Sequence, residues 1–290
     1  MIVSSERSDA NLFPSLNQGY NPPPTTSGAR FVLIQSTFIL LKGIGEVTER
    51  RLWDMGVTNW SAFLARPSLA GISSARKTLH DDQLAAAQRS LQDGHTRFFS
   101  TCLKPRDHWR LFGAFQSRAV YLDIETTGGP PQHGEVTVVG LYGGGRMTTL
   151  VLGETLTESR LREELSRYDL IVSFFGSVFD IPYLRAKFPT LRLDQPHIDL
   201  CFAARRIGLG GGLKHIETLA GIERPADLAG LDGWDAVRLW QEWRRGRRAS
   251  RDLLVAYNEA DVRNLEPLAD LLYRRLSERY DPLRPLVLPA

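Results

Sequence analysis

Hydrophobic and polar positions divide the chain into a helical front section and a longer section in which strands and helices alternate. After residue 115, short apolar runs rich in β-branched residues indicate strands, and runs with helical periodicity follow them. The predicted strands cover 119–125, 136–141, 147–152 and 170–174, and the predicted helices cover 158–168, 181–188, 213–219, 234–243 and 250–278. Early hairpins followed by crossover helices predict an α/β fold, with a mixed sheet flanked by helices.

The front section is predicted to be a small helical domain. Helical patterns cover 48–55, 60–64 and 82–91. Residues 1–28 contain Pro22–Pro24 and few aliphatic side chains, so we expect a disordered leader there. The predicted organisation is therefore a leader (1–28), a helical module with a connector (29–112), the α/β domain (113–280) and a tail (281–290).

Composition narrows the class of protein. The chain has 290 residues, of which 42% are hydrophobic and 24% charged, as in ordinary globular proteins. Its two cysteines, Cys102 and Cys201, exclude a disulfide framework. No apolar run reaches about 18 residues, and no signal-peptide pattern opens the chain. We expect a cytoplasmic protein that does not associate with membranes.

Positive charge is concentrated in the front section. The formal net charge is +3, but residues 30–112 contain 12 basic and 7 acidic residues. A second basic cluster could follow a nucleic-acid backbone or could be a solvated charge run. It consists of Arg244, Arg245, Arg247, Arg248 and Arg251.

The first predicted strand carries two acidic residues, Asp123 and Glu125. Because side chains alternate along a strand, both carboxylates point to the same face. Neighbouring carboxylates repel each other, and a hard divalent cation such as Mg²⁺ offsets their charge. A surface strand that ends in acids before a turn is the alternative interpretation.

Further acids occur at two later positions. Asp180 stands at the start of a predicted helix, where it could also be an N-cap. Tyr257 and Asp261 are four residues apart in the last predicted helix, so they lie on one helical face.

The order Asp-x-Glu, Phe-Asp, Tyr-x-x-x-Asp resembles the three motifs of the DEDD exonuclease superfamily, in its tyrosine-bearing branch, which has an RNase H-like fold. The resemblance covers about residues 115–280 and is closest to predicted bacterial and archaeal RNase H-like nucleases. The matching segments are Asp123-Ile-Glu-Thr-Thr-Gly128, His197-Ile-Asp-Leu200, Gly212-Leu-Lys-His-Ile-Glu217, Gly233-Trp-Asp-Ala-Val-Arg-Leu-Trp240 and Tyr257-Asn-Glu-Ala-Asp-Val262.

The resemblance implies catalytic roles for five residues. Two Mg²⁺ or Mn²⁺ ions would be held by Asp123, Glu125, Asp180 and Asp261, and Tyr257 would orient the attacking water. Contacts with the nucleic acid are expected from Thr126, Thr127 and Phe179.

The chain departs from the family pattern at two positions. Related proteins usually have Asn-Gly where this chain has Phe175-Gly176, and a leucine where it has Gly129. Both positions usually flank the terminal nucleotide, so the departures bear on how the substrate is held.

Three further features are open to two interpretations. Asp199 is either an outer-shell carboxylate near the metals or a structural acid. Lys214, which follows Gly210–Gly212, either binds phosphate or follows a flexible connector. Gly43 and Gly45 lie in a pattern that resembles a helix-hairpin-helix module, whose backbone N–H groups would bind DNA phosphate; packing or protein interaction is the alternative.

The expected function is metal-dependent hydrolysis of nucleic-acid phosphodiesters, 3′→5′ from a single-stranded end. The alternatives are a catalytically silent nucleic-acid-binding module, or an endonuclease acting on structured substrates. The sequence leaves open whether DNA or RNA is the substrate and whether the protein has protein partners.

Overall fold

A five-stranded mixed sheet forms the centre of the protein. The computed structural model describes residues 33–283, so the predicted leader and most of the predicted tail lie outside the described residues. The strands are β1 (Ala119–Thr126), β2 (Val136–Gly143), β3 (Arg146–Val151), β4 (Leu170–Ser173) and β5 (His197–Asp199). Their order is β3-β2-β1-β4-β5; β1, β2 and β3 are antiparallel neighbours, whereas β1, β4 and β5 run parallel.

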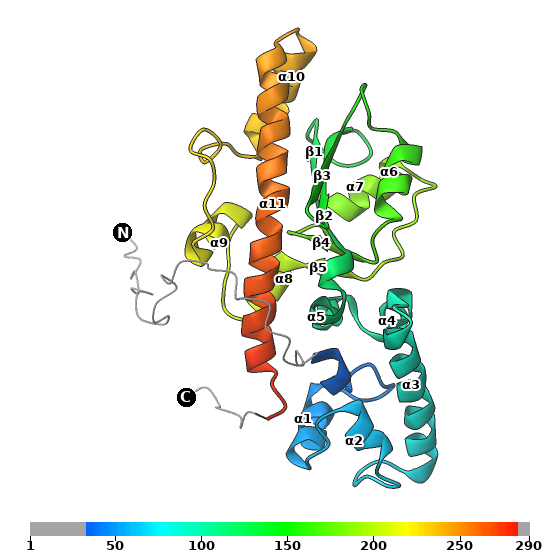
Figure 1. The fold of residues 1–290 in the computed structure, drawn as a ribbon. Helices are drawn as coiled ribbons and strands as arrows, with labels where there is room; N and C mark the ends of the chain where they lie inside the picture. Colours follow the sequence, from blue (N-terminus) through cyan, green and yellow to red (C-terminus); the bar gives the residue numbers. More distant parts are fainter. Residues whose placement is uncertain (1–32, 284–290) are drawn as a thin grey trace, which may run out of the picture.

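Helices cover both faces of this sheet (Figure 1). One face carries α6 (Glu158–Leu165) and α7 (Asp180–Lys187). The long helix α11 (Arg248–Arg279) packs on β1 and β2 from the other side. It is accompanied by α8 (Leu200–Arg205), α9 (Leu213–Ala220) and α10 (Gly233–Arg244). The predicted α/β fold, a mixed sheet flanked by helices, is thereby confirmed. No helix within residues 33–283 is long and apolar enough to span a membrane.

Side chains on β1 alternate between the two faces of the sheet, with apolar residues on one face and acidic residues on the other. Val120, Leu122 and Ile124 point into the apolar core shared with α6 and α7. The intervening residues, among them Asp123 and Glu125, face α11. A register irregularity between Glu125 and Thr126 ends the regular pairing with β2, and such bulges redirect side chains at strand ends.

A glycine lets α11 approach the sheet closely. Gly140 on β2 pairs with Asp123 on β1. A Cβ atom at Gly140 would overlap the side chains of Asn258 and Val262 on α11. The absence of a side chain at Gly140 therefore sets the distance between α11 and the strand that carries Asp123.

The front section is helical, as predicted, with boundaries that differ. Before the Gly43-Ile-Gly45 turn, residues Leu33–Ser36 form a 3-10 helix. The helix predicted at 82–91 begins earlier, at Ser74. The elements are η1 (Leu33–Ser36), α1 (Glu46–Asp54), α2 (Trp60–Leu64), α3 (Ser74–Gln92), α4 (Thr96–Cys102), η2 (Pro105–Leu111), α5 (Phe112–Phe115) and η3 (Gln116–Arg118).

A buried ion pair organises this section. Arg110 of η2 lies 2.9 Å from Glu49 of α1, and both side chains are fully buried. Glu49 also accepts hydrogen bonds from the backbone N–H groups of Phe38 and Ile39. Separating η2 from α1 would leave each of these two charges without its partner, which is unfavourable for a buried group. The ion pair therefore holds η2 and α1 together.

One apolar core continues from the front section into the α/β domain. Phe99 and Phe115 pack in the same cluster as Leu268 and Leu272 of α11. At the same junction the backbone N–H of His197 on β5 donates to Nδ1 of His108 on η2 at 3.1 Å. The front section is thus packed against β5 and α11 rather than tethered to them.

We predict that Gly140→Ala destabilises the fold, because the new methyl group must push α11 away from β2. Overpacking of this kind costs about 1–3 kcal/mol. Urea unfolding measures the loss, with Gly210→Ala as the control, since a Cβ at Gly210 meets nothing within 4 Å. Equal stability of the two variants would contradict the close approach.

Acid should weaken the junction through His197. Burial, opposed in part by Asp199, lowers its pKa from 6.5 to about 4. The unfolded chain therefore takes up a proton near pH 6.5 and the folded protein near pH 4, so acidification through this window favours unfolding. We predict that the wild type loses free energy of unfolding relative to His197→Asn between these pH values. A constant difference would contradict the burial of a neutral imidazole.

Candidate functional site

Three acidic residues converge between β1 and α11. Carboxylate oxygens of Asp123, Glu125 and Asp261 lie within 4.8 Å of one another. They line a cavity of about 220 Å³, together with Asp180 at the start of α7 and Tyr257 on α11. Residues about 140 positions apart in the sequence are thus brought to one place, as the predicted motifs require. We call this space the acid cavity.

Asp123 is held in place by a residue on the facing helix. The Asn258 side chain is fully buried and donates its Nδ2 to Oδ2 of Asp123 at 2.8 Å. Asn258 was not among the residues singled out from the sequence, although it follows Tyr257 directly in the last motif. Its one signal was its place within that motif.

Burial and then like charges raise the proton affinity of the two strand carboxyls. Burial, followed by repulsion from Glu125 and Asp180, holds the pKa of Asp123 well above its ordinary value, and Asn258 opposes the shift. Burial and then Asp261 do the same to the pKa of Glu125. A cation in the cavity would relieve this repulsion.

Asp180 lies in the acid cavity but outside the group of three. Its Oδ1 accepts a hydrogen bond from the backbone N–H of Ile124 at 3.0 Å. Burial raises the pKa of Asp180 to about 7, and the hydrogen bond from Ile124 opposes this. Asp180 does not cap α7, because Phe179 occupies the N-cap position. Its metal-binding role stays a prediction.

An arginine that the sequence analysis did not identify contacts the third acid. Arg224, in the loop after α9, forms an ion pair with Asp261. Its guanidinium also binds Glu217 on α9, from Nε at 2.5 Å and from Nη2 at 2.7 Å. The Arg224 side chain is 6% exposed. This loop position carried no sequence signal, since the partner acid lies 37 residues away in the chain.

Tyr257 and Lys214 form a pair at the edge of the acid cavity. Lys214 Nζ donates to the Tyr257 hydroxyl at 3.1 Å and lies 4.6 Å from the ring centroid. Burial and then the nearby carboxylates, Asp261 foremost, raise the pKa of Tyr257. The phenol therefore keeps its proton at neutral pH. The Lys214 ammonium group contacts this phenol.

The two threonines after the acids take part in the turn that ends β1. Thr126 Oγ1 accepts from the backbone N–H of Gly128 at 3.1 Å, and Thr127 Oγ1 accepts from that of Glu135 at 2.8 Å. Thr126 and Phe179 line the acid cavity, and Phe179 is exposed. Their contacts with nucleic acid stay predictions.

Asp199 acts on the loop before α7. Its Oδ1 accepts from the backbone N–H of Phe175 at 2.8 Å, and its Oδ2 accepts from that of Ser177 at 3.0 Å. It also caps α8 through Cys201 N. These bonds hold the loop before α7, and Asp199 is not in the group of three carboxylates. Its role as an outer-shell carboxylate stays a prediction.

The two departures from the family pattern have different backbone consequences. Gly129 has φ +79°, where a leucine would be strained. Phe175 has φ +61° and is the one non-glycine residue with positive φ in the described chain. Asparagine tolerates this region better than phenylalanine does. The backbone at Phe175 is therefore more strained than it would be with asparagine at this position.

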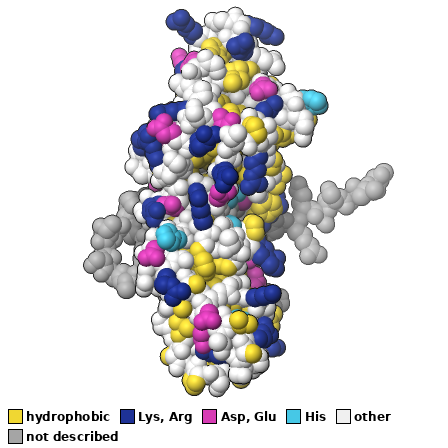
Figure 2. Space-filling model, turned by 90° about the vertical axis from the view of Figure 1, so that its right-hand side faces the viewer, with side chains coloured by type: hydrophobic (Ala, Val, Ile, Leu, Met, Phe, Trp, Pro, Cys, Tyr) yellow, Lys and Arg dark blue, Asp and Glu magenta, His cyan; other side chains and the backbone are white. Residues whose placement is uncertain are grey.

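The remaining basic and glycine features lie at the surface. Gly43 and Gly45 are exposed in the turn before α1, and their phosphate contact stays a prediction. Within the arginine cluster, Arg251 is paired with Glu154 at 2.5 Å and Arg247 lies 3.6 Å from Glu242. Figure 2 shows basic and acidic side chains interspersed over one face of the molecule, without a single basic stripe.

The cavity fits a hard divalent cation. Its donors are carboxylate oxygens, which Mg²⁺ and Mn²⁺ prefer. Three of these groups already lie close enough together to share an ion, and burial raises the pKa of each, with carboxylate repulsion adding to the shift at Asp123 and Glu125.

Two solved structures match part of this chain. The family B DNA polymerase from the hyperthermophilic archaeon Pyrobaculum calidifontis matches 53% of this chain at 18% identity with a TM-score of 0.44. The alignment spans 24% of the polymerase chain, about a quarter of its length. A structure described as the apo form of the nuclease matches 61% of this chain and 79% of its own, at 21% identity and a TM-score of 0.42.

Sequence comparison identifies the family to which the α/β domain belongs. No curated protein matches the chain. The model of the RNase_H superfamily matches residues 120–273, which include the sheet except Ala119 and most of α11. This match covers more than half of the chain, and the mixed five-stranded sheet flanked by helices is consistent with it. The chain therefore belongs to the RNase_H superfamily.

Proposed function

We propose that this protein is a metal-dependent nuclease that hydrolyses phosphodiesters from the 3′ end of a single-stranded nucleic acid. One observation carries the proposal: carboxylates from two ends of an RNase_H superfamily domain converge in one open cavity. Uncompensated carboxylates are unfavourable unless a cation is bound, and divalent cations catalyse phosphodiester cleavage in such settings.

Asp123, Glu125 and Asp261 would hold one divalent ion, and Asp180 would complete the site for a second. Bound there, Mg²⁺ or Mn²⁺ would acidify the attacking water and neutralise charge on the leaving oxygen. Asn258 keeps the Asp123 carboxylate turned into the cavity, and Arg224 does the same for Asp261.

Tyr257 would orient the attacking water as a hydrogen-bonding phenol. Its raised pKa argues against a role as general base at neutral pH. Lys214 fixes the hydroxyl through a 3.1 Å hydrogen bond and adds positive charge beside the acids. That charge would attract the scissile phosphate.

The tyrosine spacing and the order of the acids support the assignment to the tyrosine-bearing DEDD branch, and hence the 3′→5′ direction. The front section, with its excess of basic residues, would add contacts with the nucleic-acid backbone. Gly43 and Gly45 are the expected phosphate contacts there.

We predict that Asp123→Asn abolishes cleavage without unfolding the protein, because the substitution removes a ligand and relieves repulsion. The assay uses a 5′-labelled single strand of DNA or RNA with Mg²⁺, Mn²⁺ or a chelator. Asp194→Asn, an exposed aspartate outside the cavity, is the control. A ladder that shortens from the 3′ end in the wild type is the expected result.

Other results of this assay would contradict the proposal. Cleavage of a circular strand would favour the endonuclease. Retained binding with no cleavage in either metal would favour the silent binding module.

Tyr257→Phe should lower kcat about 10- to 100-fold, because misplacing a reactant by about an ångström costs rates of this order. The dissociation constant for Mn²⁺ should not change, since the phenol is not among the ligands. Steady-state kinetics and calorimetric titration measure the two quantities. An unchanged kcat would remove Tyr257 from the reaction.

A further inference from the structure

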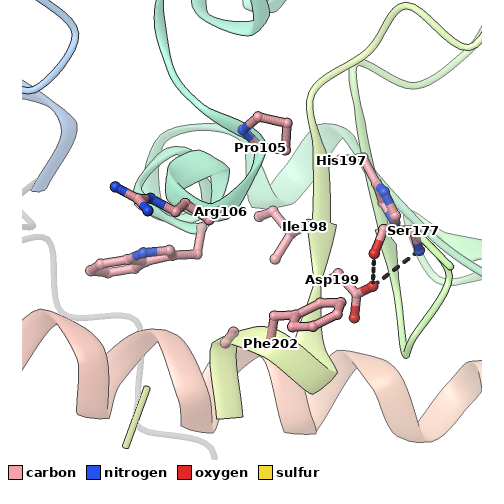
Figure 3. Close-up of a pocket in the computed structure, with 9 residues that line it drawn as sticks. Pro105, Arg106, Ser177, His197, Ile198, Asp199 and Phe202 are labelled. Atoms are coloured by element: carbon pink, nitrogen blue, oxygen red, sulfur yellow. Dashed lines mark hydrogen bonds between the residues drawn. The ribbon is translucent and has the colours of Figure 1, made fainter. Parts of the chain in front are cut away.

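A second cavity lies where the front section meets the α/β domain. It has a volume of about 260 Å³ and lies between η2, β5 and α8. Figure 3 shows Pro105 and Arg106 on one side of it, and Ser177, Asp199 and Phe202 on the other. We call this space the junction pocket. Residues His197 to Asp199 of the matching segment His197–Leu200 line it, but none of the carboxylates of the acid cavity does.

Two aromatic rings connect the junction pocket to the acid cavity. Phe175 lines the acid cavity, and Phe202 lines the junction pocket. Their ring centroids are 6.2 Å apart. They are 39% and 38% exposed respectively, which is unusual for phenylalanine. A continuous aromatic surface therefore runs from the acids to the junction pocket.

The backbone keeps Phe175 on this path despite strain. The residue has φ +61°, which is costly for a bulky side chain. Asp199 holds it through the hydrogen bond from Phe175 N, and accepts three further bonds, from Ser177 N, Ser177 Oγ and Cys201 N. These four hydrogen bonds offset the negative charge of Asp199. The carboxylate therefore repels an anionic strand in the pocket less strongly.

The pocket also offers positive charge. The Arg205 guanidinium lies 5.1 Å from the Phe202 ring centroid. The Arg106 side chain, which lines the pocket, is 63% exposed and lies 3.5 Å from Asp107. Trp109 adds a further aromatic side chain to the lining. Flat apolar walls and arginines are complementary to a nucleobase and its phosphate.

We propose that the junction pocket binds a base of the strand whose scissile phosphate lies at the acid cavity, with that base stacked on Phe202. This inference rests on the proposed nuclease function and adds a binding site to it. The strand would leave the acids over Phe175 and reach the front section at Arg106. The front section would thereby help to hold the substrate.

Fluorescence of 2-aminopurine tests the site, because stacking on an aromatic side chain quenches this base. Single strands carrying 2-aminopurine at one position, counted from the 3′ end, are bound in Ca²⁺, and a gel checks that they stay intact. Quenching should be strongest at one internal position. Phe202→Leu should remove it and weaken binding about tenfold, in line with the loss of one stacked base.

Two further variants separate stacking from charge and from general damage. Arg106→Gln should weaken binding and lower the slope of log K against log salt by about one, as expected for one phosphate contact. Leu79→Ala, which alters an exposed apolar residue on α3, should change neither quantity. Thermal melting checks that each variant is folded.

Cleavage by the wild type in Mg²⁺ or Mn²⁺ is measured in parallel. If the wild type cleaves but Phe202→Leu leaves position-specific quenching and affinity intact, the junction pocket is overturned and the nuclease is retained. If quenching depends on Phe202 but neither metal supports cleavage, the nuclease is overturned and the pocket is retained as a nucleic-acid-binding site. Equal quenching at every position also overturns the pocket.

Discussion

Repulsion among buried carboxylates is the constraint on which the structure depends. Asp123, Glu125 and Asp261 share one small space, and burial raises the pKa of each. Such a cluster persists only if neighbouring groups oppose the repulsion and the surrounding fold is rigid. Asn258 and Arg224 supply part of this opposition. A bound divalent cation would supply the rest.

The fold can be understood from what this cluster requires. β1 turns Asp123 and Glu125 to one face and its apolar residues to the other, where they are packed by α6 and α7. The missing side chain at Gly140 lets α11 approach closely enough for Asn258 to reach Asp123. The long helix α11 then continues past the sheet and packs against the front section. Stability and site geometry therefore share the same contacts.

The strand and helix order, the fold class and the acid cluster were predictable because periodicity and motif spacing are local properties of the sequence. Asp123 and Glu125 on one strand face are an example. Three features were not predictable for a physical reason. Arg224 acts on Asp261 across 37 residues of sequence, the short helix α8 begins immediately after β5 with Asp199 as its cap, and the packing of η2 depends on a buried pair between Arg110 and Glu49. Each of these is a long-range or boundary effect that no local pattern reports.

Metal binding at the acid cavity is the property that the proposed function requires most directly. The most direct measurement is a crystal structure of the protein soaked in Mn²⁺, with anomalous differences collected near the manganese edge. We predict an anomalous peak bounded by carboxylate oxygens of Asp123, Glu125 and Asp261. Manganese bound only elsewhere, or no peak in crystals whose acid cavity is open to solvent, would contradict the account.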